Sequence, residues 1–81
     1  MIYIVYECDN HRSYNSISIK EIFTNRQKAI AYYNKGVRLF NKQGETDWYI
    51  NLARHVPRMN ESFDNNVLRE MVLIKSNEED V

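Results

Sequence analysis

Residues 23–44 read FTNRQKAIAYYNKGVRLFNKQG, and this stretch decides the fold. Its apolar side chains recur at three- and four-residue steps, which places them on one face of an α-helix. Thr24 and Gln27 have the spacing of a capping box at the start of that helix. Gly44 stands where helices commonly end in the left-handed conformation. We therefore predict one long amphipathic helix over residues 25–43. Its apolar stripe consists of Ala29, Ile30, Tyr33, Val37 and Phe40.

Two details of this helix bear on its packing. Tyr32 and Tyr33 are adjacent, so only one can point squarely at a sheet, and we assign Tyr33 to the core and Tyr32 to the flank. Gly36 costs up to about 1 kcal/mol in a helix interior relative to alanine. Either the helix approaches the sheet closely at Gly36, or the glycine is simply tolerated there.

Four other segments have the composition or the alternation of β-strands. Together with the helix they predict an α+β fold of order ββαββ, an antiparallel sheet with the helix packed on one face. The last segment also fits a helical period, although its apolar run favours a strand. The polar stretch after the third strand contains Phe63, which we expect to pin it to the body. The predicted strands are residues 1–8, 17–23, 47–56 and 67–75.

The first predicted strand is apolar on both faces, with Ile4 and Tyr6 on one side and Tyr3 and Val5 on the other. A single helix covers only one face of a sheet. Burying a side chain of this kind is worth roughly 1.5–3 kcal/mol, and an uncovered apolar patch usually marks an interaction surface. Either the loops of the chain cover the second face, or a second copy or another protein does, and we expect the latter. The residues expected on that open face are Tyr3, Val5, Met71 and Leu73.

The 81 residues suit a single domain, which we place at 1–76, followed by an acidic flexible tail at 77–81. Eleven basic and eleven acidic residues balance overall, but they are segregated along the chain. Residues 20–58 carry a net charge of +5 and the remainder carries −5. The balance by itself gives no indication of nucleic acid or membrane as a partner.

One cysteine, Cys8, cannot form an internal disulfide, which favours a reducing compartment. The apolar run at the N-terminus is too short for a signal peptide or a spanning helix. We therefore expect a cytoplasmic protein that makes no membrane contact.

Few residues could carry chemistry. Cys8 and His11 have a C-x-x-H spacing, and His55 is the other histidine, but a zinc site would need a further ligand from Glu7 or Asp9. No glycine-rich phosphate loop and no oxyanion hole accompany them. We expect no catalytic residue, no metal and no cofactor, and hence a protein that is not an enzyme.

Six tyrosines and one tryptophan fit protein recognition, where amphipathic aromatic residues are enriched. Nucleic-acid binding is the alternative, because basic residues follow the polar side of the helix and Tyr32 and Trp48 could stack on bases. The residues predicted to bind a protein partner are Tyr3, Val5, Tyr14, Tyr49, Arg54 and Arg58. Those predicted for nucleic acid are Arg26, Lys28, Lys35, Arg38 and Lys42.

The first 33 residues resemble a pattern found in small uncharacterised proteins of phages and mobile elements. The matching pieces are Ile2-Tyr3-Ile4-Val5-Tyr6-Glu7, then residues 19–23 with Thr24, then Lys28-Ala29 and Tyr32. The resemblance covers less than half of the chain and implies a ββα start. It also implies a partner in the host or phage, with the protein binding and blocking a host defence factor as anti-CRISPR proteins do. It assigns no catalytic residue.

Overall fold

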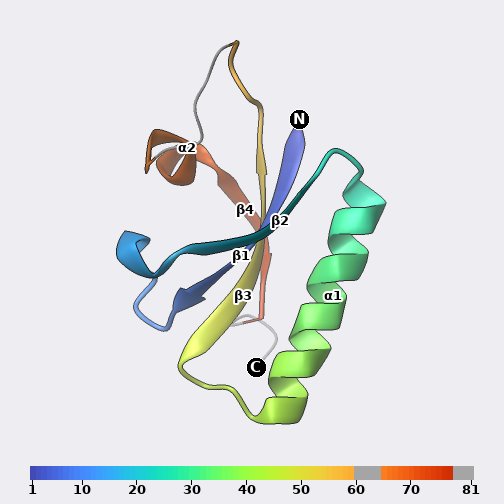
Figure 1. The fold of residues 1–81 in the computed structure, drawn as a ribbon, viewed down its shortest axis with the longest axis vertical. Coiled ribbons are helices and arrows are strands. Elements are labelled where there is room, and N and C mark those ends of the chain that lie inside the picture. Colours follow the sequence, from blue (N-terminus) through green and yellow to red (C-terminus); the bar gives the residue numbers. More distant parts are fainter. Residues whose placement is uncertain (60–64, 78–81) are drawn as a thin grey trace.

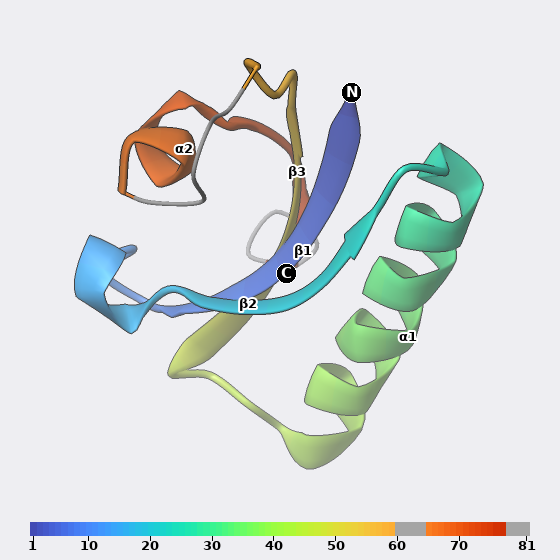
Figure 2. The ribbon, with the colours of Figure 1, turned by 45° about the horizontal axis from the view of Figure 1, so that its top comes forward.

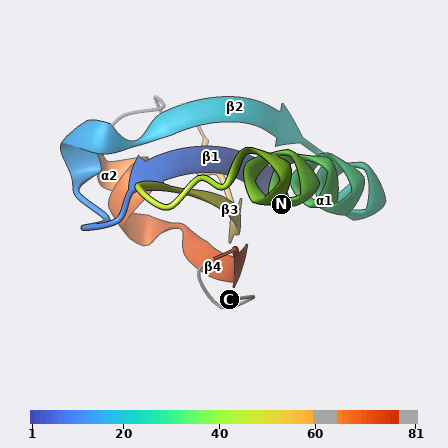
Figure 3. The same cartoon turned by 90° about the horizontal axis from the view of Figure 1, so that it is seen from below.

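The computed structural model describes residues 1–59 and 65–77 and has the predicted α+β class. Four strands form one antiparallel sheet in the order β2-β1-β3-β4. An 18-residue helix, α1, and a six-residue helix, α2, lie on opposite sides of that sheet (Figure 3). The bounds are β1 Ile2–Asp9, β2 Ser18–Phe23, α1 Arg26–Gln43, β3 Trp48–His55, α2 Asn65–Glu70 and β4 Val72–Ser76.

The N-cap of α1 is Asn25. Its side chain accepts a hydrogen bond from the Lys28 N–H at 3.1 Å, and its backbone is extended, as an N-cap requires. The prediction that Thr24 caps the helix is therefore wrong by one residue. At the other end Gly44 has φ 68°, and its N–H donates to the Asn41 carbonyl at 3.2 Å, which confirms the predicted stop.

Helix α1 packs against β3, β1 and β2. Tyr33 is buried in this contact, while Tyr32 lies on the flank beside Phe23, with ring centroids 5.5 Å apart, so both assignments are confirmed. A methyl group added at Gly36 would collide with the side chain of Ile50, so the close approach of helix and sheet explains the glycine. The core on this side consists of Val5, Ala29, Tyr33, Phe40, Ile50 and Leu52.

The face of β1 that was expected to be open is the face under α1. Val5 is fully buried there and Tyr3 is half-buried, so the expectation that both lie on an uncovered face is wrong. Both faces of β1 are apolar, and that pattern alone does not say which face the helix covers. The second face carries Ile4, Tyr6, Cys8 and Ala53, and these side chains are buried as well.

The chain itself covers the second face. The short 3-10 helix η1 (Tyr14–Ser16) and α2 lie on the side of the sheet away from α1 (Figures 1 and 2). Met71, Ile17 and Ile19 pack against the second core. The run predicted as one strand over 67–75 is thus divided between α2 and β4. The expectation that a second copy or another protein, rather than the chain itself, covers the face left by α1 is wrong.

The folded body extends one residue further than predicted. Asn77 is buried, its Oδ1 accepts from the Ile50 N–H at 2.9 Å, and its N–H donates to the Ile50 carbonyl at 3.1 Å. The rest of the predicted tail, 78–81, lies outside the described residues, as does Phe63. Within the described ranges no helix is both long enough and apolar enough to cross a membrane.

Candidate functional site

A hollow lies at one end of the sheet, where β1 begins, β3 ends and β4 begins. It has a volume of about 560 Å³, and a second hollow of about 280 Å³ shares Met1, Arg54 and Val72 with it. We call the two together the arginine groove. Its lining residues are Met1, Tyr3, Arg26, Arg54, His55, Val56, Arg58, Glu70, Val72, Leu73 and Ile74.

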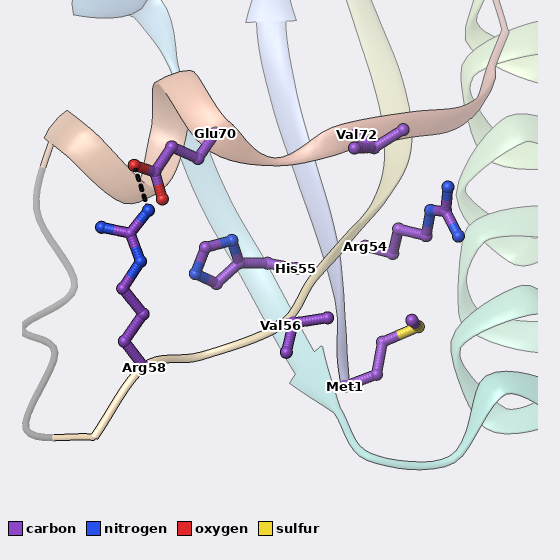
Figure 4. A pocket seen from close by; sticks show the side chains of 7 residues that line it. All are labelled: Met1, Arg54, His55, Val56, Arg58, Glu70 and Val72. Carbon is purple, nitrogen blue, oxygen red and sulfur yellow. Dashed lines mark hydrogen bonds and ion pairs between the residues drawn. The ribbon is translucent and has the colours of Figure 1, made fainter.

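The alternation of β3 places its last two side chains on different walls of the groove. Arg54 pairs with Tyr3 and points toward α1, whereas His55 pairs with Ile2 and points toward α2 (Figure 4). Arg54 is exposed and His55 is buried. Arg54 is therefore the charged group at the centre of the groove, since it lines both hollows.

A second arginine reaches the groove from α1. Arg26 is the first residue of this helix and lines the smaller hollow with Arg54 and Tyr3. The first turn of α1 contains no acidic residue, so the partial positive charge of the helix N-terminus adds to that of Arg26. This end of the groove is positively charged.

The third arginine is already paired. The Arg58 Nη2 donates to the Glu70 Oε1 at 2.9 Å, which joins the segment after β3 to the end of α2 (Figure 4). Both side chains are largely exposed, so this pair contributes little to stability. With Glu70 counted against the three arginines, the lining has a net charge of +2.

Apolar side chains separate these charges. Met1 is 54% exposed, Val56 is 64% exposed and Val72 is 49% exposed, and all three line the larger hollow. Arginine and methionine beside aromatic residues are the enriched composition of protein interfaces. A guanidinium can bind a carboxylate through two parallel hydrogen bonds, so the groove suits an acidic segment that also presents apolar side chains.

The residues predicted to bind a protein partner are only partly brought together. Arg54, Arg58 and Tyr3 line the groove. Val5 is fully buried beneath α1. Tyr49 lies half-buried near the start of β3, opposite Cys8 and at the other end of the strand from the groove. The backbone of Tyr14 belongs to η1, but its side chain lies outside what the structure describes.

Sequence reasoning missed Met1, Val56, Val72 and Glu70 as members of the groove. The available signal was a valine beside Pro57, just after a strand that ends in arginine and histidine. The strand order brings these segments together, and the order was not predicted.

The residues predicted for nucleic acid separate into two groups. At about 100° per residue, Lys28, Lys35, Arg38 and Lys42 fall within an arc of about 80° on the solvent side of α1. We call these four the basic stripe, and all four are exposed. Arg26 lies about 180° from Lys35 around the helix and belongs to the groove instead. No acidic residue occurs anywhere in α1.

The side chains considered for a metal or a nucleophile lie in different parts of the fold. Cys8 is buried on the second face, His11 is exposed in the loop, and His55 lies at the other end of the sheet. Among the described residues no group of three or more His, Cys, Asp or Glu side chains could hold a metal ion.

Cys8 belongs to a polar network that is buried around Asn51. The Asn51 Nδ2 lies 3.3 Å from the Cys8 Sγ, and the Asn51 Oδ1 accepts from the Arg12 Nη1 at 3.4 Å. The other Arg12 nitrogen, Nη2, donates to the Ser76 hydroxyl at 3.2 Å. The network ties the loop after β1 to β3 and β4, and its visible role is to satisfy buried polar groups.

The same loop is held from its other end by Asp9. Its carboxylate accepts from the Ser13 N–H at 3.1 Å, the Ser13 hydroxyl at 2.8 Å and the His11 N–H at 3.1 Å. The hydrogen bonds from Ser13, first from its backbone and then from its hydroxyl, lower the pKa of Asp9 below the ordinary value. The loop therefore has a defined shape, built on one ionised carboxylate.

Comparison of the chain with protein-family models, with curated proteins and with solved structures finds no match.

Proposed function

We propose that this protein is a non-catalytic binding module whose arginine groove receives an acidic, partly apolar segment of another protein. The single observation that carries the proposal is the placement of Arg54 and Arg26 on one exposed wall that also contains Met1 and Val72. Neither arginine has an ion-pair partner among the described residues. An acidic segment would supply the missing carboxylates, and its apolar side chains would cover the exposed methionine and valine.

The charge distribution along the chain supports the same proposal. Residues 20–58 carry a net charge of +5 and include all three arginines of the groove. Opposite charges on two partners speed their encounter and exclude wrong partners more than they raise affinity. We expect binding to weaken as salt is added, because the arginines are exposed and exposed charges are screened.

The identity of the partner is a finer proposal and comes from the resemblance of the first 33 residues to small phage proteins. On that basis the partner is a host defence protein, for example a CRISPR effector, which this protein blocks by occupying an acidic surface. A homodimer of this protein, acting in the host cell cytoplasm, is compatible with that role.

Capture from a bacterial lysate tests the proposal, provided that two charge-matched variants are compared. Arg26→Glu with Arg54→Glu reverses the groove, and Arg38→Glu with Lys42→Glu reverses the basic stripe by the same total charge. We expect proteins captured by the wild type to be retained by the stripe variant and lost from the groove variant, as measured by quantitative mass spectrometry.

Equal loss from both variants would mean that bulk charge, rather than the groove, holds the captured proteins. Retention by the groove variant would reject the proposal outright. Thermal unfolding of each variant provides the control, since all four substituted side chains are exposed and the fold should persist.

Nucleic-acid binding is the second candidate, and one observation favours it. The basic stripe runs for about 21 Å along α1 without an acidic residue, although neighbouring like charges cost a helix a few tenths of a kcal/mol. Four phosphate contacts would make the affinity fall steeply with salt. In this case the stripe variant should lose affinity for DNA or RNA while the groove variant keeps most of it. A response that is flat with salt and equal for both variants rejects this candidate.

A further inference from the structure

A hollow of about 310 Å³ opens between α1 and the sheet, where Glu7 of β1 lies beside Ile50 of β3. This is the other end of the sheet from the arginine groove, because β1 ends and β3 begins here. Among the described residues the hollow and the groove share no lining side chain, so a ligand in one leaves the other free. We call it the α1 hollow, and its lining residues are Glu7, Lys20, Tyr32, Lys35, Gly36, Leu39, Phe40 and Ile50.

The wall of the hollow that α1 provides changes from charged to apolar with depth. At about 100° per residue, the positions around the helix measured from Lys35 are about 40° for Leu39, 60° for Tyr32, 100° for Gly36 and 140° for Phe40. Exposure falls in the same order, from 52% for Leu39 through 38% for Tyr32 to 9% for Phe40. A molecule in the hollow therefore meets an ammonium group at the rim and hydrocarbon below it.

Gly36 leaves a gap in this flank of α1. Tyr32 stands four residues before the glycine and Leu39 three residues after it, so two large side chains border a position that has none. The side chain of Ile50, which is 3% exposed, lies against Gly36 and forms the floor. A ligand in the gap would cover the exposed parts of both bordering side chains, and that burial of apolar surface favours binding.

The charged groups that line the hollow sum to one positive charge. The Lys20 Nζ lies 2.8 Å from the Glu7 Oε2, so these two groups neutralise each other. Lys35 is exposed and forms no ion pair with any described residue. An anion can therefore pair with Lys35, whereas a cation meets a carboxylate that is already bound. A second copy of α1 is a poor occupant, because this helix has basic residues and no acidic ones.

We propose that the α1 hollow binds a small aliphatic carboxylate, a fatty acid of medium chain length. Its carboxylate pairs with the Lys35 ammonium group, and its chain lies against Leu39, Phe40 and Ile50. A single uncompensated positive charge suits one carboxylate rather than several. The volume lies at the lower end of the range for ligand pockets, which suits a short chain better than a nucleotide or a large cofactor.

Titration of the ¹⁵N-labelled full chain with sodium butanoate, hexanoate and octanoate, followed by amide chemical shifts, tests the proposal. We expect the largest shifts at residues 32–40 and at Ile50. We expect the dissociation constant to fall about two- to fourfold for each added methylene, because each one buries further apolar surface. Octylammonium, which has the same chain and the opposite charge, should bind at least about tenfold more weakly than octanoate.

Two charge-matched variants locate the carboxylate. Lys35→Gln should weaken octanoate at least about threefold and leave the binding of neutral 1-octanol unchanged, because only the ion pair is lost. Lys42→Gln removes the same charge about 10 Å further along α1 and should leave octanoate binding unchanged. Both lysines are exposed, so the fold should persist in both variants.

Any of four results overturns the proposal. Octanoate causes no shifts at millimolar concentration, or its shifts fall on the arginine groove instead of residues 32–40. Binding is independent of chain length, or octylammonium binds as tightly as octanoate. Equal weakening by Lys35→Gln and Lys42→Gln would also reject it, because bulk charge on α1 would then hold the carboxylate.

Discussion

Gly36 sets the distance between α1 and the sheet. The terminal methyl of Ile50 occupies the space that a side chain at Gly36 would need, and Ile50 itself is buried in the core under α1. The glycine costs helix propensity, and the close packing of Ile50 offsets that cost. The two positions therefore act as one unit.

We predict that Gly36→Ala destabilises the protein by up to about 1 kcal/mol, because the terminal methyl of Ile50 has to move and the gain in helix propensity offsets part of that cost. In an Ile50→Val background, which lacks the colliding methyl, the same substitution should be neutral or stabilise by up to about 1 kcal/mol through helix propensity. Denaturant unfolding of the four proteins measures both effects. The same cost of Gly36→Ala in both backgrounds would show that Ile50 does not set this distance.

Asp9 makes the stability of the first loop depend on pH. Its folded pKa lies below the ordinary value of 3.8, mainly because the backbone and hydroxyl of Ser13 donate to its carboxylate. A depressed acid pKa contributes stability that is present above the unfolded pKa and is lost as the pH falls through the folded pKa. We predict that wild-type stability falls more steeply than that of Asp9→Asn as the pH drops below 3.8.

Thermal unfolding across an acid pH series provides that comparison, with Asp47→Asn as the control, because Asp47 is an exposed carboxylate outside this loop. Parallel pH profiles for the wild type and Asp9→Asn would show that the ionised carboxylate does not hold the loop.

At the level of the elements, strong periodicity was predictive and short segments were not. The pattern of α1 runs for five turns and ends at a glycine, so its type and its end followed from sequence. The alternation of β3 was equally clear. The run 67–75 is shorter and fits both periods, and the chain uses both, a helix up to Glu70 and a strand from Val72.

The start of α1 could not be resolved because Thr24 and Asn25 are both good N-caps. We predict that Asn25→Ala lowers the unfolding free energy by about 1 kcal/mol, because the Lys28 N–H loses its acceptor. Thr24→Ala, one residue earlier and equally exposed, should change it by less than about 0.5 kcal/mol. Denaturant unfolding separates the two, and a larger effect at Thr24 would contradict the observed cap.

At the level of the whole molecule, both faces of β1 were correctly predicted to be apolar. The face predicted to be open, that of Tyr3 and Val5, is the one that packs against α1. Period-two alternation sorts Tyr3 and Val5 from Ile4 and Tyr6, but it does not say which set meets α1. That choice depends on the strand order and on how the chain crosses from β2 to β3. Helix α2, which lies over the second face of the sheet, includes the first part of the segment 67–75, whose sequence fits both a helix and a strand.

The candidate site depends on the same three-dimensional information. Arg54 and Arg58 were selected from the sequence, whereas Arg26 was grouped with the basic residues of the helix. The fold separates Arg26 from that group and places it beside Arg54. Among the described residues, the exposed end of the sheet is one surface where arginines and apolar side chains meet, and a smaller hollow lined by Arg12 and Arg69 on the second face is another.

The most direct measurement is a hydrogen–deuterium exchange comparison of the protein alone and in complex with a partner captured by the wild type and not by the groove variant. We predict slowed exchange at residues 1–3, 54–58 and 70–74, with the amides at 35–42 of α1 unchanged. Slowed exchange along 35–42 with the groove segments unchanged would contradict it and would assign recognition to the basic stripe.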